Sequence, residues 1–479
     1  MNKKNIDIEN ITVGVVIFDK SLRQVILKQR NDISLFPNKY GIPGGKVKVG
    51  ENLISAVRRE LYEEHQLIIE NFSYINLYKC QDIYLFVYSA ILEENNESFV
   101  LLEDIHNLEL APNIDNAISE SIEFMRNSAQ ILDINMFKLK QNVITQIANS
   151  IVEVKGQIGW DHFLFQNRIG IIGTAVGLEI LNNSDCNKKL KESIYETLIQ
   201  LQLTNGGWGV KNLDNKYAVT ESTCICLSAL YGFTRYLNDP IINAVQWIKD
   251  NRLDSGLWGY NKNSSQGRII TTCMVLNTFS ELGIDFYIEE TVNIILKYQN
   301  YDGGWGFINN SPSNLSATCF VVLTLISYRG KNDPCIINAI SWIENKLKNN
   351  FIVDESEVEY IGDKRFEYKH STHIYVLCAL LKQKGIDNIS PLFLYKSMIN
   401  IINSRNPNGF WEHSLTPDRF PIWHTNNILK FFNLLISEAG ILNLSWIKSR
   451  FECYKFELDC IRILSSERQI SEQETIVYY

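Results

Sequence analysis

The feature that most constrains the fold is a repeat of tryptophan and threonine that runs through most of the chain. A tryptophan in a glycine-containing turn occurs five times, and a threonine that opens an apolar segment follows it after 13 to 15 residues. A sixth such segment opens at Thr372, but the residues before it, Asp354–Lys369, contain no tryptophan. Successive threonines are 46 to 54 residues apart, which is typical of a repeated two-helix unit. The five complete pairs are Trp160–Thr174, Trp208–Thr223, Trp258–Thr272, Trp305–Thr318 and Trp411–Thr425.

An amphipathic segment precedes each turn, so amphipathic and nearly all-apolar helices alternate six times. A helix that is apolar on every side has to be buried, whereas an amphipathic helix can face water on one side. This alternation predicts a closed double ring of twelve helices, with the apolar set inside and the threonines near one rim as helix N-caps. The amphipathic segments are roughly 135–153, 190–203, 238–251, 286–300, 334–348 and 390–404.

Two of the turns, QLTNGGW at 202–208 and QNYDGGW at 299–305, resemble the QW motifs of the terpenoid cyclase and protein prenyltransferase superfamily. The resemblance implies an all-α α6–α6 toroid over about residues 133–465. Class II cyclases of that superfamily carry a D-x-D-D motif just before the helix-opening threonine, but no aspartate stands at the corresponding positions before Thr318 and Thr223. A D-D-x-x-D motif is absent as well. The chain is therefore not expected to be a cyclase.

Residues 1–130 have the pattern of a separate α/β domain. Two strand-like runs at 11–18 and 24–27 are separated by a polar turn, and further β-rich runs follow at 74–78 and 83–92. Residues 115–126 are typical of a closing helix. This order predicts a mixed sheet with flanking helices, followed by the toroid and a polar C-terminal tail at 466–479.

Between these strands lies a helix with an unusual concentration of acids, within GKVKVGENLISAVRRELYEEHQL at 45–67. Glu60, Glu63 and Glu64 fall on one helix face, because positions i, i+3 and i+4 are neighbours there. Three carboxylates on one face repel one another unless a cation lies among them. Hard cations take carboxylate oxygens, and Mg2+ keeps positions open for water and substrate phosphates. The spacing therefore predicts a helix that holds Mg2+ against a phosphorylated ligand.

The same residues resemble the Nudix family, whose box reads G-x5-E-x7-R-E-U-x-E-E-x-G-U, where U is apolar. The one departure is Gln66, where the family has a glycine that would end the helix in a left-handed turn. Upstream, YGIPGG at 40–45 resembles the lead-in W-x-x-P-G-G of the family. The matching positions are Gly45, Glu51, Arg59, Glu60, Leu61, Glu63, Glu64 and Leu67.

The resemblance also implies roles for these residues. Glu60, Glu63 and Glu64 would hold Mg2+ or Mn2+, and Glu51 would add a ligand through water. Arg59 would orient Glu63, four residues further on. Glu60, Glu63, Glu64 and Arg59 would form the catalytic set, and Gly44 and Gly45 would contact the substrate.

A second candidate site lies in the toroid. Protein prenyltransferases bind Zn2+ at the starts of inner helices, and the setting of His424 before Thr425 resembles that of their histidine. His370 and His373 open the preceding inner helix in an H-x-x-H pair, so the three histidines form an alternative Zn2+ site. The Asp and Cys ligands of the prenyltransferases have no counterpart. Anion binding at the helix N-termini is a further alternative, with Arg268, Lys364, Arg365 and Lys369 nearby in the sequence.

Composition limits the classes of partner. A net charge of −8 argues against nucleic acid as the main partner. No apolar run approaches the 18 residues of a transmembrane span, and no secretory signal is recognisable at the start. The ten cysteines are scattered, and five of them lie in apolar helical segments. We therefore expect a cytoplasmic protein with reduced cysteines.

Three functions remain open at this stage. In the first, the chain hydrolyses a small-molecule nucleoside diphosphate derivative, ADP-ribose-like or a dinucleotide, and the toroid binds a ligand or a protein partner. In the second, the toroid holds the prenyl chain of an isoprenoid diphosphate while the acidic helix acts on the diphosphate. In the third, both halves bind ligands without turnover.

Overall fold

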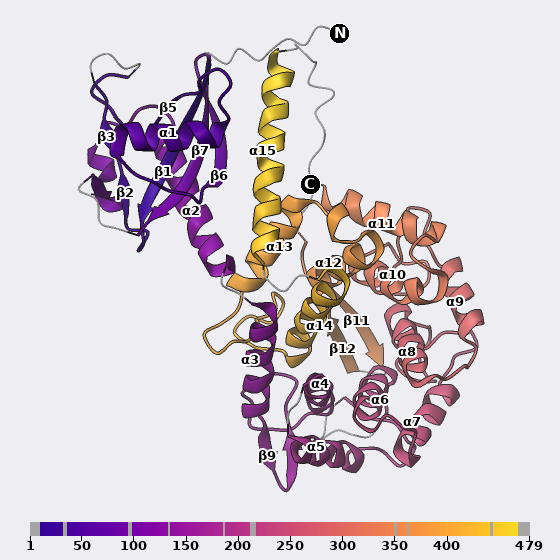
Figure 1. Ribbon diagram of the computed structural model, residues 1–479. Helices are drawn as coiled ribbons and strands as arrows, with labels where there is room; N and C mark the ends of the chain where they lie inside the picture. The colour runs from indigo at the N-terminus through magenta and orange to yellow at the C-terminus, as the bar shows by residue number, and fades with distance from the viewer. Residues whose placement is uncertain are drawn as a thin grey trace. The chain divides into compact units, whose positions relative to one another are not determined.

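The computed structural model describes residues 10–31, 36–93, 98–132, 135–184, 187–210, 217–348, 352–361, 364–440 and 444–467. The chain divides into two compact units (Figure 1). The first comprises residues 1–134 and 443–476, and the second comprises residues 135–442 with the last three residues of the chain. The expected tail at 466–479 lies outside the described residues from position 468 onward.

The first unit is built on a mixed sheet. Strand β1 (Ile11–Asp19) lies parallel to β7 (Ile83–Leu92) at its centre, and six consecutive residues of β1 are buried. Burial on both faces explains why β1 is a continuous apolar run instead of an alternating one. The sheet order is β6 (Ser73–Cys80), β7, β1, β2 (Gln24–Ile26) and β8 (Phe99–Leu101), and β5 (Gly44–Lys46) pairs with β1. The small strands β3 (Lys28–Gln29) and β4 (Tyr40–Gly41) pair with each other.

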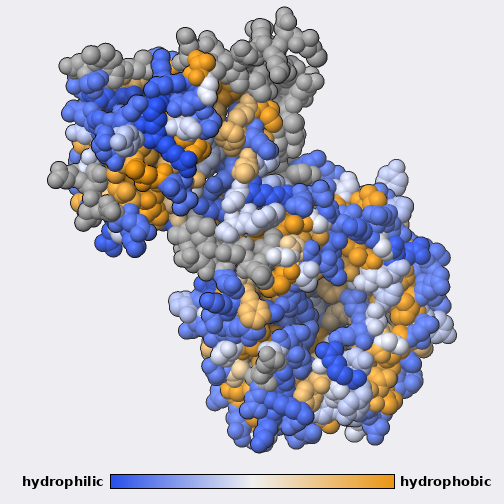
Figure 2. Space-filling model, viewed as in Figure 1, coloured by the Kyte–Doolittle hydropathy of each residue, from blue (hydrophilic) through white to orange (hydrophobic). Residues whose placement is uncertain are grey.

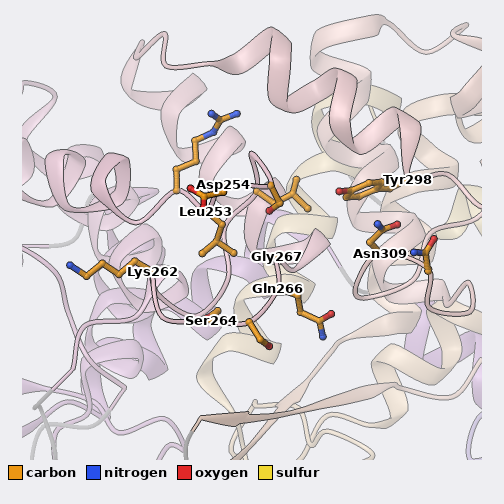
Figure 3. Close-up of a pocket in the computed structure, with 13 residues that line it drawn as sticks. Leu253, Asp254, Lys262, Ser264, Gln266, Gly267, Tyr298 and Asn309 are labelled. Carbon is orange, nitrogen blue, oxygen red and sulfur yellow. The ribbon is translucent and has the colours of Figure 1, made fainter.

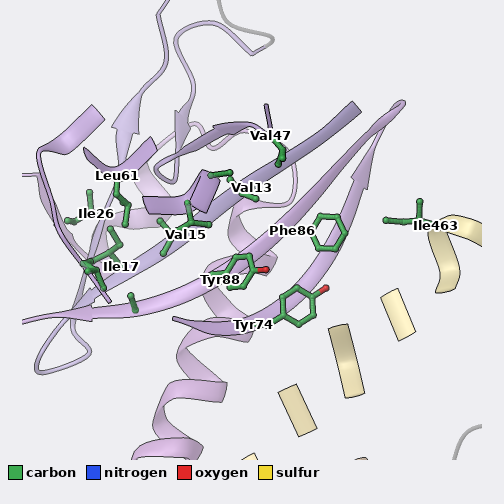
Figure 4. Packing of buried hydrophobic residues seen from close by; sticks show 14 residues of the cluster. Val13, Val15, Ile17, Ile26, Val47, Leu61, Tyr74, Phe86, Tyr88 and Ile463 are labelled. Carbon is green, nitrogen blue, oxygen red and sulfur yellow. The ribbon is translucent and has the colours of Figure 1, made fainter. Parts of the chain in front are cut away.

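Helices cover this sheet as expected for an α/β fold. The acidic helix α1 (Leu53–His65) contacts β5 and β1, and α2 (Ile114–Leu132) contacts β6 and β7. The 3-10 helix η2 (Leu102–Asn107) follows β8. Val13, Val15 and Ile17 from β1 pack with Leu61 of α1 in one apolar core (Figure 4). The predicted mixed sheet with flanking helices is confirmed.

The last described helix, α15 (Ser445–Glu467), belongs to the first unit and not to the helical repeat. Its Asp459 accepts a hydrogen bond of 2.7 Å from the hydroxyl of Tyr74 in β6, and its Ile463 is 2% exposed within the sheet's apolar core. The expected end of the toroid at residue 465 is therefore corrected to Leu442. The sheet of the first unit buries apolar and polar groups of α15, so α15 belongs to that unit. The toroid therefore stands, in the chain, between two segments of the first unit.

The second unit contains twelve principal helices among its described residues, in two sets. Each inner helix contacts the next, and α14 contacts α4, so the ring of inner helices is closed (Figure 1). The inner helices are α4 (Ile171–Asn182), α6 (Thr220–Thr234), α8 (Ile269–Leu282), α10 (Leu315–Arg329), α12 (Thr372–Lys384) and α14 (Ile422–Ala439). The outer helices are α3 (Met136–Asn149), α5 (Lys188–Gln200), α7 (Asp239–Asp250), α9 (Ile288–Lys297), α11 (Pro334–Leu347) and α13 (Pro391–Asn403).

The second unit also contains two short hairpins, so the expectation of an all-helical region was incomplete. Strand β9 (Val152–Val154) pairs with β10 (Gln157–Gly159) in the first repeat. Strand β11 (Ser356–Ile361) pairs with β12 (Lys364–Lys369) in the repeat that lacks the tryptophan. No described helix is both long enough and apolar enough to cross a membrane.

The tryptophan and threonine of a repeat clamp an outer helix to the next inner helix. The indole N–H of Trp258 donates to the carbonyl of Ile248 at the end of α7, over 2.8 Å, and the backbone N–H of Trp258 donates to the hydroxyl of Thr272, over 3.0 Å. The hydroxyl in turn donates to the carbonyl of Arg268. The same backbone-to-threonine bond occurs in three further repeats, at Trp160–Thr174, Trp208–Thr223 and Trp305–Thr318.

This clamp corrects the role expected for the threonines. Thr272 stands three residues after the first residue of α8, so it is not the N-cap; Arg268 holds that position. The hydroxyl of Thr272 accepts a hydrogen bond from the buried backbone N–H of Trp258, which lies in a turn and so has no partner within a helix. The spacing of 13 to 15 residues therefore reflects the length of loop that brings a tryptophan turn back to the first turn of the inner helix.

Replacement of Ile463 by Ala is predicted to destabilise the first unit by about 3 kcal/mol, because it leaves a cavity in the sheet's core. Hydrogen exchange of the β7 amides would measure this, since two units need not unfold in one transition. Ile461, which is 45% exposed on the same helix, is the matched control, and its replacement by Ala should cost little. Equal effects of the two changes would contradict the assignment of α15 to this core.

Replacement of Thr272 by Val is predicted to lower the stability of the second unit by about 1–3 kcal/mol, because it leaves the buried N–H of Trp258 unpaired. Thermal unfolding measures the loss. Thr425→Val is the control, since the buried Thr425 hydroxyl makes no hydrogen bond to any described residue and its removal leaves none of them without a partner. If both variants melt alike, the clamp does not stabilise the repeat.

Candidate active site

Helix α1 is delimited by its own sequence, which positions its acidic face. The Asn52 side chain caps the start by accepting a hydrogen bond of 2.8 Å from the N–H of Ser55. At the other end, Gln66 takes the left-handed conformation (φ 55°) that the missing glycine would favour, and its N–H returns to the carbonyls of Leu61 and Tyr62. The helix therefore ends where the family pattern implies, at a cost of roughly 1 kcal/mol in backbone strain.

Arg59 lies at the centre of the carboxylate cluster. Its guanidinium binds both oxygens of Glu51, each over 2.9 Å, and also lies 2.5 Å from Glu60 and 3.2 Å from Glu63. A further bond of 2.9 Å reaches the backbone carbonyl of Lys46. One cation thus offsets the repulsion of three acids. The hydrogen bond from Arg59 is the largest cause that lowers the pKa of Glu51, to about 2.

This arrangement defines what Glu51 does in the structure. It was expected to add a metal ligand through water, but both of its oxygens are engaged by Arg59, and the N–H of Lys48 donates to it as well, over 3.0 Å. Its geometry is that of a bidentate arginine–carboxylate pair, which fixes the guanidinium in place. The expected contact between Arg59 and Glu63 is present.

The two glycines lie directly beneath the acidic face. A side chain on Gly45 would meet Glu60, because a Cβ built there lies 2.4 Å from Glu60 Oε1. Gly44 donates its backbone N–H to Glu64 over 3.1 Å, and a Cβ on Gly44 would lie 2.1 Å from the carbonyl oxygen of Val13. Glycine at 45 lets β5 approach the carboxylates of α1 this closely, and glycine at 44 lets β5 lie against β1, so the backbone at 44–45 and the carboxylates of α1 form one surface.

The donor set on this surface fits a hard divalent cation. Glu60, Glu63 and Glu64 present carboxylate oxygens, with Glu63 half exposed and the side chain of Glu60 mostly covered. Within the described part of the chain, no three His, Cys, Asp or Glu side chains already converge as a metal site. Here the oxygens of Glu60 and Glu63 point to Arg59, so a cation would have to draw them away from it.

A groove lies on the same unit, between η2 and the start of α2. Its volume is about 910 Å3, and its lining mixes apolar side chains such as Ile105 and Ile118 with polar ones such as Asn116 and Arg126. One wall of the groove is hydrogen-bonded to strand β4. The backbone N–H of Tyr40 donates to the carbonyl of Glu109 over 2.7 Å, and the N–H of Ala111 donates to the carbonyl of Tyr40 over 2.8 Å. Sequence reasoning missed this groove, since its walls meet only after folding.

The three histidines proposed as a Zn2+ site do not converge. His370 stacks on Phe307 and lies 3.3 Å from Glu357. His373 hydrogen-bonds to Ser397 on an outer helix over 2.9 Å, and His424 to Ser371 over 2.7 Å. Burial and the neighbouring His413 lower the pKa of His424 to about 3. Because each ring is held by a different partner, we reject the Zn2+ alternative.

Two further histidines of the second unit, His413 and His162, were not predicted from the sequence. The ring of His413 lies 4.9 Å from that of His424, and its Nε2 lies 3.1 Å from the carbonyl of His370. His162 lies beside Trp423 in the repeat that closes the ring. A signal was available, because both histidines stand two residues after a repeat tryptophan, in WDH at 160–162 and WEH at 411–413.

A polar cleft of about 600 Å3 lies on the second unit (Figure 3). It is formed by the Trp258 turn, the loop before α8 and the segment after α9. The figure shows polar side chains from three segments around it, and its labelled residues are Leu253, Asp254, Lys262, Ser264, Gln266, Gly267, Tyr298 and Asn309. None of these residues was predicted to form a site.

Comparison with known proteins supports both halves of this architecture. Residues 9–142 match the NUDIX domain model, and residues 170–351 match the prenyltransferase alpha-alpha toroid domain model. Among curated proteins, the chain is 39% identical over 66 residues to the m7GpppN-mRNA hydrolase NUDT17 of Xenopus laevis. That match covers 13% of this chain and 22% of the relative, so the chain aligns with only about a fifth of it.

Similar solved structures were found for each half. The NUDIX domain of Shewanella oneidensis NrtR, complexed with ADP ribose, is 21% identical and covers 26% of this chain and 94% of its own, with a TM-score of 0.22. A variant of the type II terpene cyclase MstE from Scytonema, complexed with merosterolic acid A, is 12% identical and covers 63% of this chain and 97% of its own, with a TM-score of 0.44.

Replacement of Glu51 by Gln is predicted to destabilise the first unit at pH 7 and to matter less in acid. Because folding lowers the pKa of Glu51 from 4.5 to about 2, its contribution is full above pH 4.5 and is lost as the pH falls toward 2. Hydrogen exchange or urea unfolding of wild type and variant between pH 7 and pH 3 would measure the narrowing difference. Exposed Glu70 is the control for a carboxylate outside the cluster. A difference that stays constant with pH would contradict this role.

Proposed function

We propose that this chain, in which a NUDIX domain is joined to a prenyltransferase-type alpha-alpha toroid, hydrolyses a diphosphate linkage in a small molecule with Mg2+ or Mn2+. The observation that carries the proposal is the single surface made by the carboxylates of α1 and the glycine backbone of β5. Carboxylate oxygens gathered on one surface are the ligands that a hard divalent cation takes, and Mg2+ keeps positions open for phosphate oxygens.

Glu60, Glu63 and Glu64 would hold the cation. When bound, it would neutralise phosphate oxygens and lower the pKa of an attacking water. Arg59 acts as a positioning residue, because it contacts the acids and is itself fixed by Glu51. Arg59 holds the side chains of Glu60 and Glu63 close together, and a bound cation would take over their oxygens from it. Gly44 and Gly45 would lie against the substrate.

We further propose that the groove between η2 and α2 receives the group attached to the diphosphate. Its volume of about 910 Å3 is sufficient for a nucleoside, and pockets for such ligands combine apolar walls with a few polar groups. The hydrogen bonds of Tyr40 tie one wall of the groove to the strand that leads, four residues later, to Gly44. This favours a nucleoside diphosphate derivative, ADP-ribose-like or a dinucleotide, as substrate.

A second candidate is an isoprenoid diphosphate whose prenyl chain is held by the toroid. Figure 2 shows a hollow near the middle of the helical ring, with apolar atoms in it. A non-catalytic sensor and a protein-binding role for the toroid are the remaining alternatives. A substrate panel separates these possibilities: ADP-ribose, NAD+, a dinucleoside polyphosphate and geranylgeranyl diphosphate, each with Mg2+ or Mn2+ and with EDTA, assayed for phosphate-containing products.

Glu63→Gln and Glu64→Gln are predicted to lower turnover on the order of 100-fold or more while leaving the fold intact, since each removes a repelling charge without changing the packing. Glu70→Gln, on an exposed residue of the same unit, is the control and should retain activity. Initial rates on the best substrate of the panel give the comparison. Wild-type rates in a protein with glutamine at both positions would end the hydrolase proposal.

A further inference from the structure

The β11–β12 hairpin stands in the one repeat that lacks a tryptophan turn. In four other repeats the backbone N–H of the tryptophan donates to the repeat threonine; here Glu355 takes that place, and its N–H donates to Thr372 over 2.8 Å. The hairpin is therefore the counterpart of the loop that joins tryptophan to threonine elsewhere. It reaches far beyond its own repeat, because Glu357 contacts Arg268 at the start of α8. Helix α10 lies between α8 and α12 in the ring, so the hairpin crosses part of the ring's end.

Among the hairpin side chains that the structure describes, polar contacts and not an apolar core hold the hairpin in place. Among its residues between 352 and 369 whose burial is described, none is both apolar and buried: Val358 is 44% exposed, whereas the charged side chain of Glu357 is only 9% exposed. An isolated two-stranded hairpin is only marginally stable in water. Its position on the ring therefore depends on a few charged and polar groups near its base.

The strongest of these contacts centre on Arg268, whose side chain is 3% exposed. Its guanidinium pairs with Glu357 of β11, lies 3.2 Å from Glu221 of α6, and covers the ring of Tyr368 at 4.0 Å. Glu357 also lies 3.3 Å from His370. An arginine at a helix N-terminus opposes the helix dipole, so this position is stable only with anions beside it.

A second carboxylate of the hairpin segment lies at the N-terminus of α10, where the helix dipole is positive. Glu355 accepts hydrogen bonds from the backbone N–H groups of Leu315, over 3.0 Å, and Ser316, over 2.7 Å, in the first turn of α10. Helix N-termini and buried guanidinium groups are the sites that phosphate oxygens favour. Glu355 stands directly before β11 and Glu357 lies within it, two residues further on, which is about 7 Å in extended chain, so one bound molecule with two anionic groups can span both positions.

The electrostatics keep Glu357 ionised in this setting. Burial acts to raise the pKa of its carboxyl, but the hydrogen bond with His370 and the charge of Arg268 outweigh burial, and the pKa lies below its ordinary value. A buried ion pair contributes little net stability, because desolvation of the charges offsets most of their attraction. An external anion that pairs equally well with Arg268 can therefore replace Glu357 at small net cost.

We infer that the β11–β12 hairpin is a lid on the rim of the helical ring, in which Glu355 and Glu357 stand in for the anionic groups of a phosphate-bearing ligand. Such a ligand opens the lid by taking the place of Glu357 on Arg268 and His370. It can shift the equilibrium only by binding the open form more tightly, which the exchange of carboxylate for phosphate provides. This inference does not depend on the proposed hydrolase activity, since it concerns the second unit alone.

Trypsin cleavage after Arg365, followed by mass spectrometry, tests the inference, because a protease cuts a hairpin that opens faster than one that stays docked. Glu357→Gln keeps the shape of the side chain and should raise the cleavage rate on the order of tenfold. Glu367→Gln is the matched control, since the ion pair that Glu367 makes among the described residues is with Arg365 of the hairpin itself. Equal cleavage rates for wild type and Glu357→Gln would overturn the proposal that the hairpin is a lid.

Addition of inorganic pyrophosphate, with EDTA present, tests whether a phosphate-bearing ligand opens the hairpin. All proteins in this experiment carry Glu63→Gln and Glu64→Gln, so that the first unit contributes no metal-dependent binding. Pyrophosphate should raise the cleavage rate of this protein in a saturable manner. Arg268→Gln should be cut rapidly without pyrophosphate and gain nothing from it. Arg268→Lys, which retains the charge, serves if the Gln variant does not fold, and its pyrophosphate response should be weaker. No response at saturating pyrophosphate would overturn the assignment of a phosphate-bearing ligand.

Discussion

The second unit depends on one constraint: its six inner helices are apolar on nearly every side. Helices of this kind cannot face water, so each needs neighbours on both flanks and a covering layer outside. A closed ring meets this requirement because no inner helix is left at an edge, and the contact between α14 and α4 completes it. The tryptophan turns then join the layers, since each buried indole bonds to an outer helix and, in four of the five turns, the backbone N–H of the tryptophan bonds to an inner helix. Where the tryptophan is missing, the loop is free to become a hairpin.

The first unit depends on a different balance, between repulsion of carboxylates and a single guanidinium. Arg59 contacts Glu51, Glu60 and Glu63, and the close approach of Gly45 beneath Glu60 leaves no space for another side chain. The result is a compact acidic surface whose shape is set without a metal. Both units thus use a mostly buried arginine among glutamates. In the first unit the acids belong to an exposed surface, whereas in the second they come partly from a hairpin that can move away.

The connectivity of the chain joins the two halves more closely than a simple fusion would. Helix α15 returns to the first unit, where Lys448 bonds to Ser73 over 2.9 Å and Ile463 fills the core. The sheet of the first unit is therefore completed by residues that follow the toroid in the chain. Because residues 135–442 interrupt the first unit, that unit can be completed only after the whole toroid has been synthesised.

Local sequence patterns by themselves determined the parts of this protein that depend on spacing along one element. The face of Glu60, Glu63 and Glu64, the strands at 11–18 and 83–92, and the alternation of twelve helices all follow from helical or strand periodicity. Tertiary structure alone decided which partners meet across elements. In the folded chain Glu51 pairs with Arg59, and the three histidines bind different partners. The threonines bond to the tryptophan turns instead of capping helices, and α15 packs in the first unit. Such contacts join residues tens to hundreds of positions apart, and periodicity carries no information about them, because it records only which side of an element is buried and not what buries it.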